Sequence, residues 1–155
     1  MFSRRTAIAG AAATAILTAL PARAAGKTHR VGMYASDPEG KGRSMFFSPR
    51  VLRVRAGDTV TFTPETGAHN CEATPGMIPD GAKSWRGQIG KPVSVTFDKP
   101  GYYGYHCMPH RSMGMVGLVI VEGAGRNDNL AAAKAVSQPG KAKAVWQEIW
   151  AEVAG

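Results

Sequence analysis

The feature that most constrains this chain is a cluster of metal-binding side chains with the spacing Cys107-x2-His110-x4-Met115. A proline and a glycine lie within the stretch, so it can form a tight loop that directs the three side chains to one point. A thiol, an imidazole and a thioether suit copper far better than magnesium or calcium, which prefer oxygen ligands. A fourth ligand is available from His69. Two imidazoles, one thiolate and a weak axial methionine form the blue-copper arrangement used for electron transfer.

Two methionines compete for the axial position in this arrangement. Met113 lies three residues after His110 and Met115 lies five after it. We prefer Met115 because it adjoins the predicted strand that begins at Val116, which can hold it rigidly. With four protein ligands no coordination position stays open for a substrate, so the pattern favours an electron carrier over an enzyme.

The second cysteine leaves two other interpretations open. In an exported protein a pair of cysteines commonly forms a disulfide, but oxidising Cys107 would remove the one thiolate of a dense ligand cluster. Alternatively, His69-x-Cys71 and Cys107-x2-His110 could form a Cys2His2 zinc site. The long separation of the two cysteines does not match a zinc-finger module, and Met115 would then have no role. Copper is therefore favoured.

Short alternating runs rich in β-branched and aromatic residues predict an all-β domain over residues 25–126. Glycine and proline turns separate these runs, which is typical of a β-sandwich or barrel. The predicted strands are residues 31–35, an extended stretch at 45–54 that is broken at Pro49, and residues 59–63, 93–97, 102–107 and 116–121. Residues 75–91 are rich in glycine and proline and are predicted to be irregular, with a short helical turn at 82–85.

The last part of the chain, residues 127–155, has a different pattern. Residues 129–136 and 141–153 are rich in alanine, with apolar residues near helical spacing. Asn127 or Asp128 can cap the first helix, and Pro139 lies near the start of the second. Two such short helices cannot form a core alone, so we expect them to pack on the sheet.

The chain begins with a pattern typical of a signal peptide. Arg4 and Arg5 precede an apolar run at residues 7–20, and the small-x-small sequence at 22–24 offers a cleavage site. Ser3-Arg4-Arg5 also resembles a twin-arginine export signal. Cleavage after residue 24 would remove three arginines and no acidic residue, leaving five surplus positive charges. This positive surplus predicts that the protein meets a partner with an acidic surface. The sequence has no run of basic residues interleaved with aromatic ones, so nucleic-acid binding is not predicted.

Three motifs together closely resemble the pseudoazurins, which are periplasmic cupredoxins. They are Gly67-Ala68-His69-Asn70, Gly76-Met77-Ile78-Pro79-Asp80-Gly81-Ala82, and the ligand loop from Cys107 to Gly117. The resemblance covers essentially the whole mature chain. It implies a cupredoxin-like Greek-key β-sandwich of about eight strands with two C-terminal helices and one type 1 copper. It also implies electron donation to copper nitrite reductase, haem nitrite reductase or nitrous oxide reductase in denitrification.

The resemblance also implies roles for single residues. The ligand positions are His69, Cys107, His110 and Met115. Asn70 would tie the two ligand loops together and bond the thiolate through its backbone N–H, whereas Pro109 cannot donate a second such bond. A partner would dock on an apolar patch that contains Met45 and Met113 and is ringed by basic residues, for which the candidates are Lys41, Arg43, Lys83 and Arg111.

Three positions depart from the family pattern. Cys71 replaces a common valine and is expected to be a buried free thiol. Met108 replaces a threonine whose hydroxyl could steady Asn70. His106 replaces a lysine, and strand alternation predicts that its side chain points outward. We therefore expect His106 to strengthen docking when it is protonated.

Two rival functions use the same copper ligands. Copper delivery or storage would need an exchangeable, mostly Cu(I) site without intense Cu(II)–thiolate absorption. A redox enzyme or oxidase module would need a second metal site, for which only His29 and His106 remain as imidazoles. The sequence favours a diffusing electron carrier, and we expect a monomer.

Overall fold

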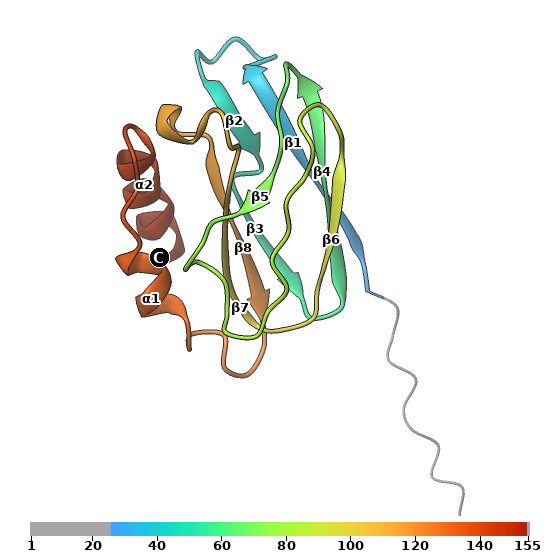
Figure 1. The fold of residues 1–155 in the computed structure, drawn as a ribbon, viewed down its shortest axis with the longest axis vertical. Coiled ribbons are helices and arrows are strands. Elements are labelled where there is room, and N and C mark those ends of the chain that lie inside the picture. The colour runs from blue at the N-terminus through green and yellow to red at the C-terminus, as the bar shows by residue number, and fades with distance from the viewer. Residues whose placement is uncertain (1–25, 155) are drawn as a thin grey trace, which may run out of the picture.

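A computed structural model describes residues 26–154 as two four-stranded sheets with two helices against one of them (Figure 1). The predicted signal peptide, residues 1–24, lies outside the described residues. The strands are β1 (Thr28–Ser36), β2 (Ser44–Ser48), β3 (Val51–Arg55), β4 (Asp58–Thr66), β5 (Glu72–Ala73), β6 (Val93–Phe97), β7 (Gly101–His106) and β8 (Val116–Glu122). The helices are a single 3-10 turn, η1 (Arg111–Met113), followed by α1 (Leu130–Ala135) and α2 (Ala142–Ala154).

The two sheets have the strand orders β2-β1-β4-β6 and β3-β8-β7-β5. The β1–β4 and β3–β8 pairs are parallel and the other pairs are antiparallel. The predicted sandwich is therefore confirmed. Both ends of the ligand loop join paired strands, since β7 enters it and β8 leaves it.

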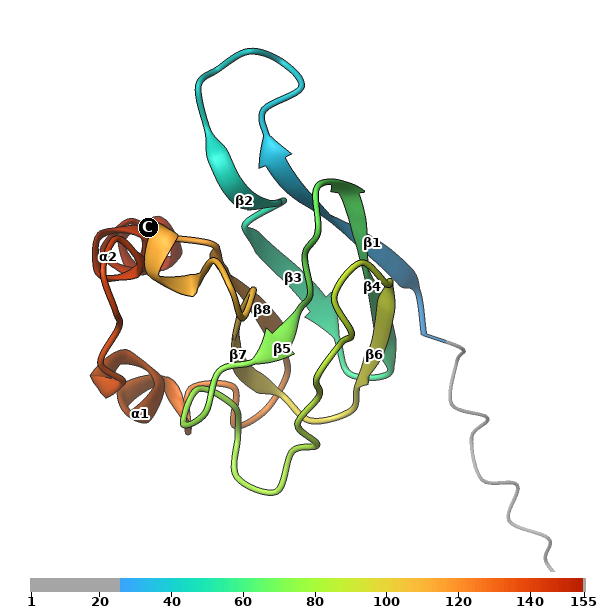
Figure 2. The same cartoon turned by 45° about the horizontal axis from the view of Figure 1, so that its top comes forward.

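The buried apolar residues form two clusters: one lies between the two sheets, and the other lies between one sheet and the helices. In β8, Val119 and Val121 face the other sheet, whereas Leu118 and Ile120 pack against helix residues that include Trp146. This alternation buries β8 on both faces, which explains why its sequence is a continuous apolar run. Figures 1 and 2 both show α1 and α2 beside β7 and β8. The prediction that the two helices pack on the sheet is therefore confirmed.

Two local predictions were wrong. The segment at 82–85 forms no helical turn: the carbonyl of Trp85 accepts a 3.0 Å hydrogen bond from Ala73 of β5. The Trp85 ring also stacks on Phe62. These contacts from distant strands hold the segment alongside β5, which is itself too short to have been predicted from the sequence.

The predicted cap of the first helix was also wrong. The residue preceding α1 is Asn129, and its side chain makes no capping bond. Instead, its amide accepts from the Tyr102 N–H (3.0 Å) and donates to the Tyr102 carbonyl (2.7 Å). Asn127 accepts from the Tyr102 hydroxyl (3.1 Å). These asparagines attach the tail to β7 rather than stabilising the helix start.

Candidate metal centre

The four candidate ligands come from chain segments that meet at one end of the sandwich. His69 follows β4, Cys107 directly follows β7, His110 precedes η1, and Met115 lies between η1 and β8. The 3-10 turn ends at Gly114, whose φ of 97° is a left-handed conformation that glycine adopts without strain. The tight turn predicted from the proline and glycine of this loop is what brings the chain back to β8.

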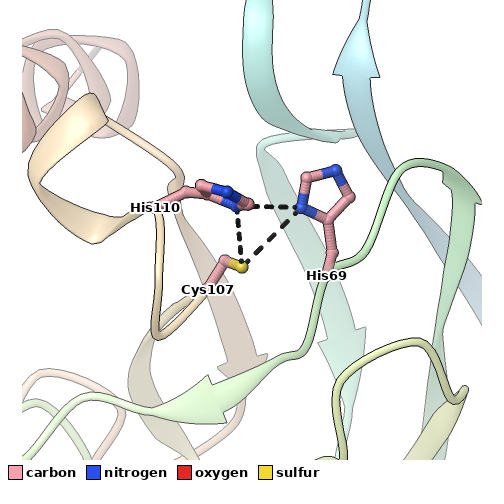
Figure 3. Close-up of side chains that lie close together, drawn as sticks. All are labelled: His69, Cys107 and His110. Atoms are coloured by element: carbon pink, nitrogen blue, oxygen red, sulfur yellow. Dashed lines mark hydrogen bonds between the residues drawn. The ribbon is translucent and has the colours of Figure 1, made fainter.

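Three of these side chains converge on one point (Figure 3). The Cys107 Sγ lies 3.4 Å from Nδ1 of His110 and 3.8 Å from Nδ1 of His69. The two Nδ1 atoms are 3.1 Å apart. Two imidazole nitrogens and a sulfur that face one another in this way form a soft donor set around a common centre, which suits a copper ion. His69 and Cys107 are fully buried, and His110 is partly exposed.

The two methionines take different positions. Met115 is fully buried, its N–H donates to the His110 carbonyl (3.2 Å), and its carbonyl accepts from the Cys107 N–H (3.0 Å). Met113 is 48% exposed, on η1. The interior position of Met115, beside two ligands, favours it as the fourth donor.

The electrostatics of the site match a bound cation. Burial raises the pKa of the Cys107 thiol, and the backbone N–H groups of Asn70 and His110 oppose that rise. Burial, and then the nearby His110, lower the pKa of His69. His69 therefore favours the neutral form that binds metals, and the buried thiol becomes a stable thiolate when a metal compensates its charge.

Comparison with known proteins agrees with this chemistry. Residues 35–122 match the family described as copper binding proteins, plastocyanin/azurin family. A pseudoazurin of Methylorubrum extorquens is 43% identical over 136 residues, which is 88% of this chain and 87% of the relative. A pseudoazurin of Paracoccus pantotrophus is 41% identical over 86% of this chain and 88% of its own. The crystal structure of pseudoazurin from Methylobacterium extorquens AM1 matches with a TM-score of 0.75 and 39% identity, over 82% of this chain and 99% of that one.

The chain belongs to the pseudoazurin family. As in other pseudoazurins, the site takes one copper ion, for which the structure offers His69, Cys107, His110 and Met115. The protein is a cupredoxin electron carrier rather than an enzyme. When bound, the copper supplies the one-electron chemistry, and the residues around it hold the ligands in place and exclude water.

Asn70 connects the two ligand loops of this pseudoazurin site. Its Oδ1 accepts a 2.8 Å bond from the Met108 N–H, and its Nδ2 donates to the Gly87 carbonyl (3.1 Å) and to Glu72 (3.2 Å). The backbone N–H of His110, which follows Pro109, also acts on the Cys107 sulfur. Pro109 has no N–H to donate, so the two backbone N–H groups that act on the Cys107 sulfur are those of Asn70, from one loop, and His110, from the other.

The second cysteine stays outside the donor cluster. Cys71 and Cys107 are both free and both fully buried. Among the described residues, the cluster whose donor atoms lie within 4.8 Å of one another is His69, Cys107 and His110, without Cys71. The zinc alternative, which needs Cys71 as a ligand, is therefore not assembled, and the expected buried thiol is present.

The structure separates the predicted docking residues. Met45, Met113 and Arg43 line one groove of about 500 Å³ between β2 and α2. Lys41 is exposed and pairs with Glu39.

Arg111 and Lys83 take other positions. The Arg111 guanidinium lies partly buried against Gln138 (3.0 Å). Lys83 is not near this groove: it lines a hollow with Asp98 and Lys99, beyond the end of β6 that pairs with Asp58. That end is the one far from His69, which follows the opposite end of β4.

Sequence reasoning missed most of the apolar surface at the site. In residues 26–154 the exposed large apolar side chains are Met113 (48%), Ile89 (49%) and Met108 (45%). Met108 directly follows Cys107, and Ile89 precedes Gly90, whose N–H donates to the His69 carbonyl (2.8 Å). Met108 and Met113 thus belong to the loop that carries three of the ligands, and Ile89 belongs to a separate loop that is bonded to the fourth. The occurrence of Met108 and Met113 in the ligand loop was a sequence signal for this apolar surface. Nothing in the sequence around Ile89 indicates that it lies near the site.

The prediction for His106 was wrong. Its side chain does leave the inter-sheet core, as strand alternation requires, but it is only 5% exposed. Nε2 lies 3.1 Å from Glu72, and Nδ1 lies 2.8 Å from the Thr74 hydroxyl. Burial, followed by the charge of Arg111, lowers the pKa of His106. Glu72 of β5 and Thr74, which follows β5, cover the imidazole, so it is not the exposed group that the prediction required.

Proposed function

We propose that this protein is a periplasmic one-electron donor to nitrite reductase or nitrous oxide reductase in denitrification. The observation that carries the proposal is the setting of His110. This imidazole reaches the Cys107 sulfur at 3.4 Å on one side and is partly exposed on the other, between Met108 and Met113. It is the one ligand of the four that is not fully buried and so offers a path from the copper site to a partner, and the apolar side chains around it can exclude water from the contact.

Charge supports an acidic partner for this face. The exposed Lys141 donates its backbone N–H to Ser112 of η1 (2.8 Å), and Arg43 lines the groove beside Met113. Lys91 follows the loop that bonds the His69 carbonyl. Basic side chains around an apolar centre steer an acidic partner and leave the contact itself dry.

Export supports the periplasmic location in this proposal. The pattern at residues 1–24 predicts a cleaved signal peptide, with the mature protein made of the sandwich at 25–126 and the tail at 127–155. Among the described residues, no helix has the length and apolar character needed to cross a membrane. N-terminal sequencing of protein recovered from the periplasm should begin at Ala25; recovery of the uncleaved chain in the cytoplasm would contradict this part.

The partner is tested by steady-state turnover. Reduced protein should support nitrite or nitrous oxide reduction by one of the three reductase classes added singly, and Lys141→Glu should lower the association rate several-fold at low ionic strength. Lys27→Glu is the matched control, because it changes the net charge equally near Asp58, at the other end of the sandwich. If the association rate falls equally in both variants, the partner does not dock on the face around His110. If no reductase turns over with the reduced protein, the proposed partner class is wrong.

A further inference from the structure

Cys71 and Cys107 each lie one residue beyond the last pair of the β5–β7 ladder. In the β5–β7 ladder Glu72 pairs with His106 and Ala73 pairs with Tyr105. Continued by one residue, the same antiparallel register would set Cys71 against Cys107. The segments stay together beyond that step, because the Asn70 side chain bonds the Met108 N–H at 2.8 Å. The two cysteines are thus held between contacts on both sides.

The hydrogen bonds show which kind of pair this is. Thr74 donates its N–H to the Gly104 carbonyl (2.8 Å), so the bonded positions of the ladder are 74–104 and, two residues on, 72–106. The alternating positions 73–105 and 71–107 are of the non-bonded type. Consistently, the Ala73 N–H bonds Trp85 and the Cys71 carbonyl accepts from Gly87 (2.9 Å), both outside the ladder.

Non-bonded antiparallel pairs have the shorter separation of the two kinds. Their Cα atoms lie about 4.5 Å apart, within the roughly 4.4–6.8 Å that a disulfide spans. Cys71 and Cys107 also belong to the same buried cluster between the sheets, so both side chains project from one face. A turn about the Cα–Cβ bond of Cys107 would direct its sulfur from the imidazoles towards Cys71.

We propose that Cys71 and Cys107 form a disulfide in the copper-free protein and that this bond and copper binding exclude each other. The proposal rests on the role of Cys107 as the copper thiolate. A cysteine at position 71 would then make copper loading dependent on the thiol redox state. Copper bound first would protect Cys107 from oxidation, and oxidation first would block the site until a reductant acts.

The oxidant in this step is a low-molecular-weight disulfide such as glutathione disulfide. The Cys107 thiolate attacks one of its sulfurs, forms a mixed disulfide and expels one glutathione thiolate. The Cys71 thiolate then attacks Sγ of Cys107 and expels the second. The two protein thiols lose two electrons and two protons, which convert one glutathione disulfide into two glutathione molecules.

The test uses copper-free protein in two arms. In the first, the folded protein is incubated with glutathione disulfide. In the second, reduced and unfolded protein is refolded in a glutathione redox buffer, so that access to buried sulfur does not limit the reaction. Intact mass, thiol count after denaturation and non-reducing peptide maps are recorded. The blue Cu(II)–thiolate absorption is then measured after copper addition, before and after treatment with a phosphine reductant. Cys71→Val, which keeps a buried apolar side chain, is the matched control.

We expect the wild-type chain to lose about 2 Da and both thiols together, with a peptide that links Cys71 to Cys107. Copper uptake should then be lost and should return after reduction, whereas Cys71→Val should take up copper throughout. If both arms leave two free thiols, or give only glutathione adducts or linked dimers, the proposal is wrong. Equal copper uptake by oxidised wild-type and variant protein would also overturn it. A failure of reduced Cys71→Val to become blue would instead count against the copper site itself.

Discussion

The backbone N–H of Cys107 donates a 3.0 Å hydrogen bond to the carbonyl of Met115. This bond closes the ligand loop at its base, directly beyond the last β7–β8 pair, His106 with Val116. The thiolate and the fourth donor are therefore fixed to each other by the same ladder that joins the two strands. The intervening turn, which carries His110, is free to reach the surface.

The fourth ligand can be identified by two matched variants. Met115→Leu should raise the reduction potential and change the visible and EPR spectra, because loss of the thioether removes a donor that stabilises Cu(II). Met113→Leu should leave both unchanged, since Met113 is exposed on η1. Voltammetry and absorption spectra of the two copper-loaded variants test this. The reverse pattern would make Met113 the ligand.

Removal of the Asn70 side chain should loosen the connection between the ligand loops. Asn70→Ala leaves the N–H of Met108 and the carbonyl of Gly87 without their partner, at a cost of about 1–3 kcal/mol each when buried. We expect a lower free energy of unfolding in urea and faster copper loss to a chelator. Gln147→Ala, at an exposed position on α2, is the control and should change stability much less. An unchanged chelation rate in Asn70→Ala would show that the loops hold without this side chain.

Acid stability should depend on Asp58 at the opposite end of the sandwich. Its carboxylate accepts bonds from the Arg55 N–H (3.0 Å), the His29 ring (2.9 Å) and the Lys27 N–H (2.8 Å). These bonds lower the pKa of Asp58 from 3.8 to about 2. A lowered pKa stabilises the fold above the unfolded-state value, and that contribution disappears as the pH falls from about 4 towards 2.

The measurement for Asp58 compares copper-free wild type with Asp58→Asn in urea unfolding between pH 6 and 2. Wild type should be more stable near neutrality, and the gap should narrow as the pH falls below about 4. Asp80→Asn, at an exposed position, should stay within about 0.5 kcal/mol of wild type at neutral pH. If the difference in free energy of unfolding between the two proteins stays constant from pH 6 to pH 2, the ionisation of Asp58 does not contribute to stability.

The helical tail should contribute to the stability of the whole domain. Ile149 of α2 is fully buried in the layer that includes Leu118 and Ile120 of β8. Ile149→Ala should therefore lower the free energy of unfolding by about 2–5 kcal/mol. Gln147→Ala on the exposed side of α2 should change it by less than about 0.5 kcal/mol. If thermal melts of both variants match the wild type, α2 is dispensable to the fold.

Much of the architecture could be predicted because its signals are local. The β6 strand has exactly its predicted bounds, and α1 and α2 differ from their predicted ranges by one residue at each end. Alternation and helical spacing record which face of each segment is buried, so the sequence carries that information directly. The two residues of β5 form no such pattern, and only their pairing with β7 makes them a strand.

The composition and spacing of the sequence alone determined the metal chemistry: a thiolate, an imidazole and a thioether in a tight loop, with a second imidazole elsewhere, suit copper wherever they are brought together. Tertiary structure decided what surrounds them. It covered His106 with Glu72 and Thr74, brought Ile89 to the His69 loop, and placed Cys71 and Cys107 next to the last β5–β7 pair. The reason is physical. A ligand's affinity for a metal is a property of its own atoms, whereas exposure and partnership depend on which distant segment packs against a residue.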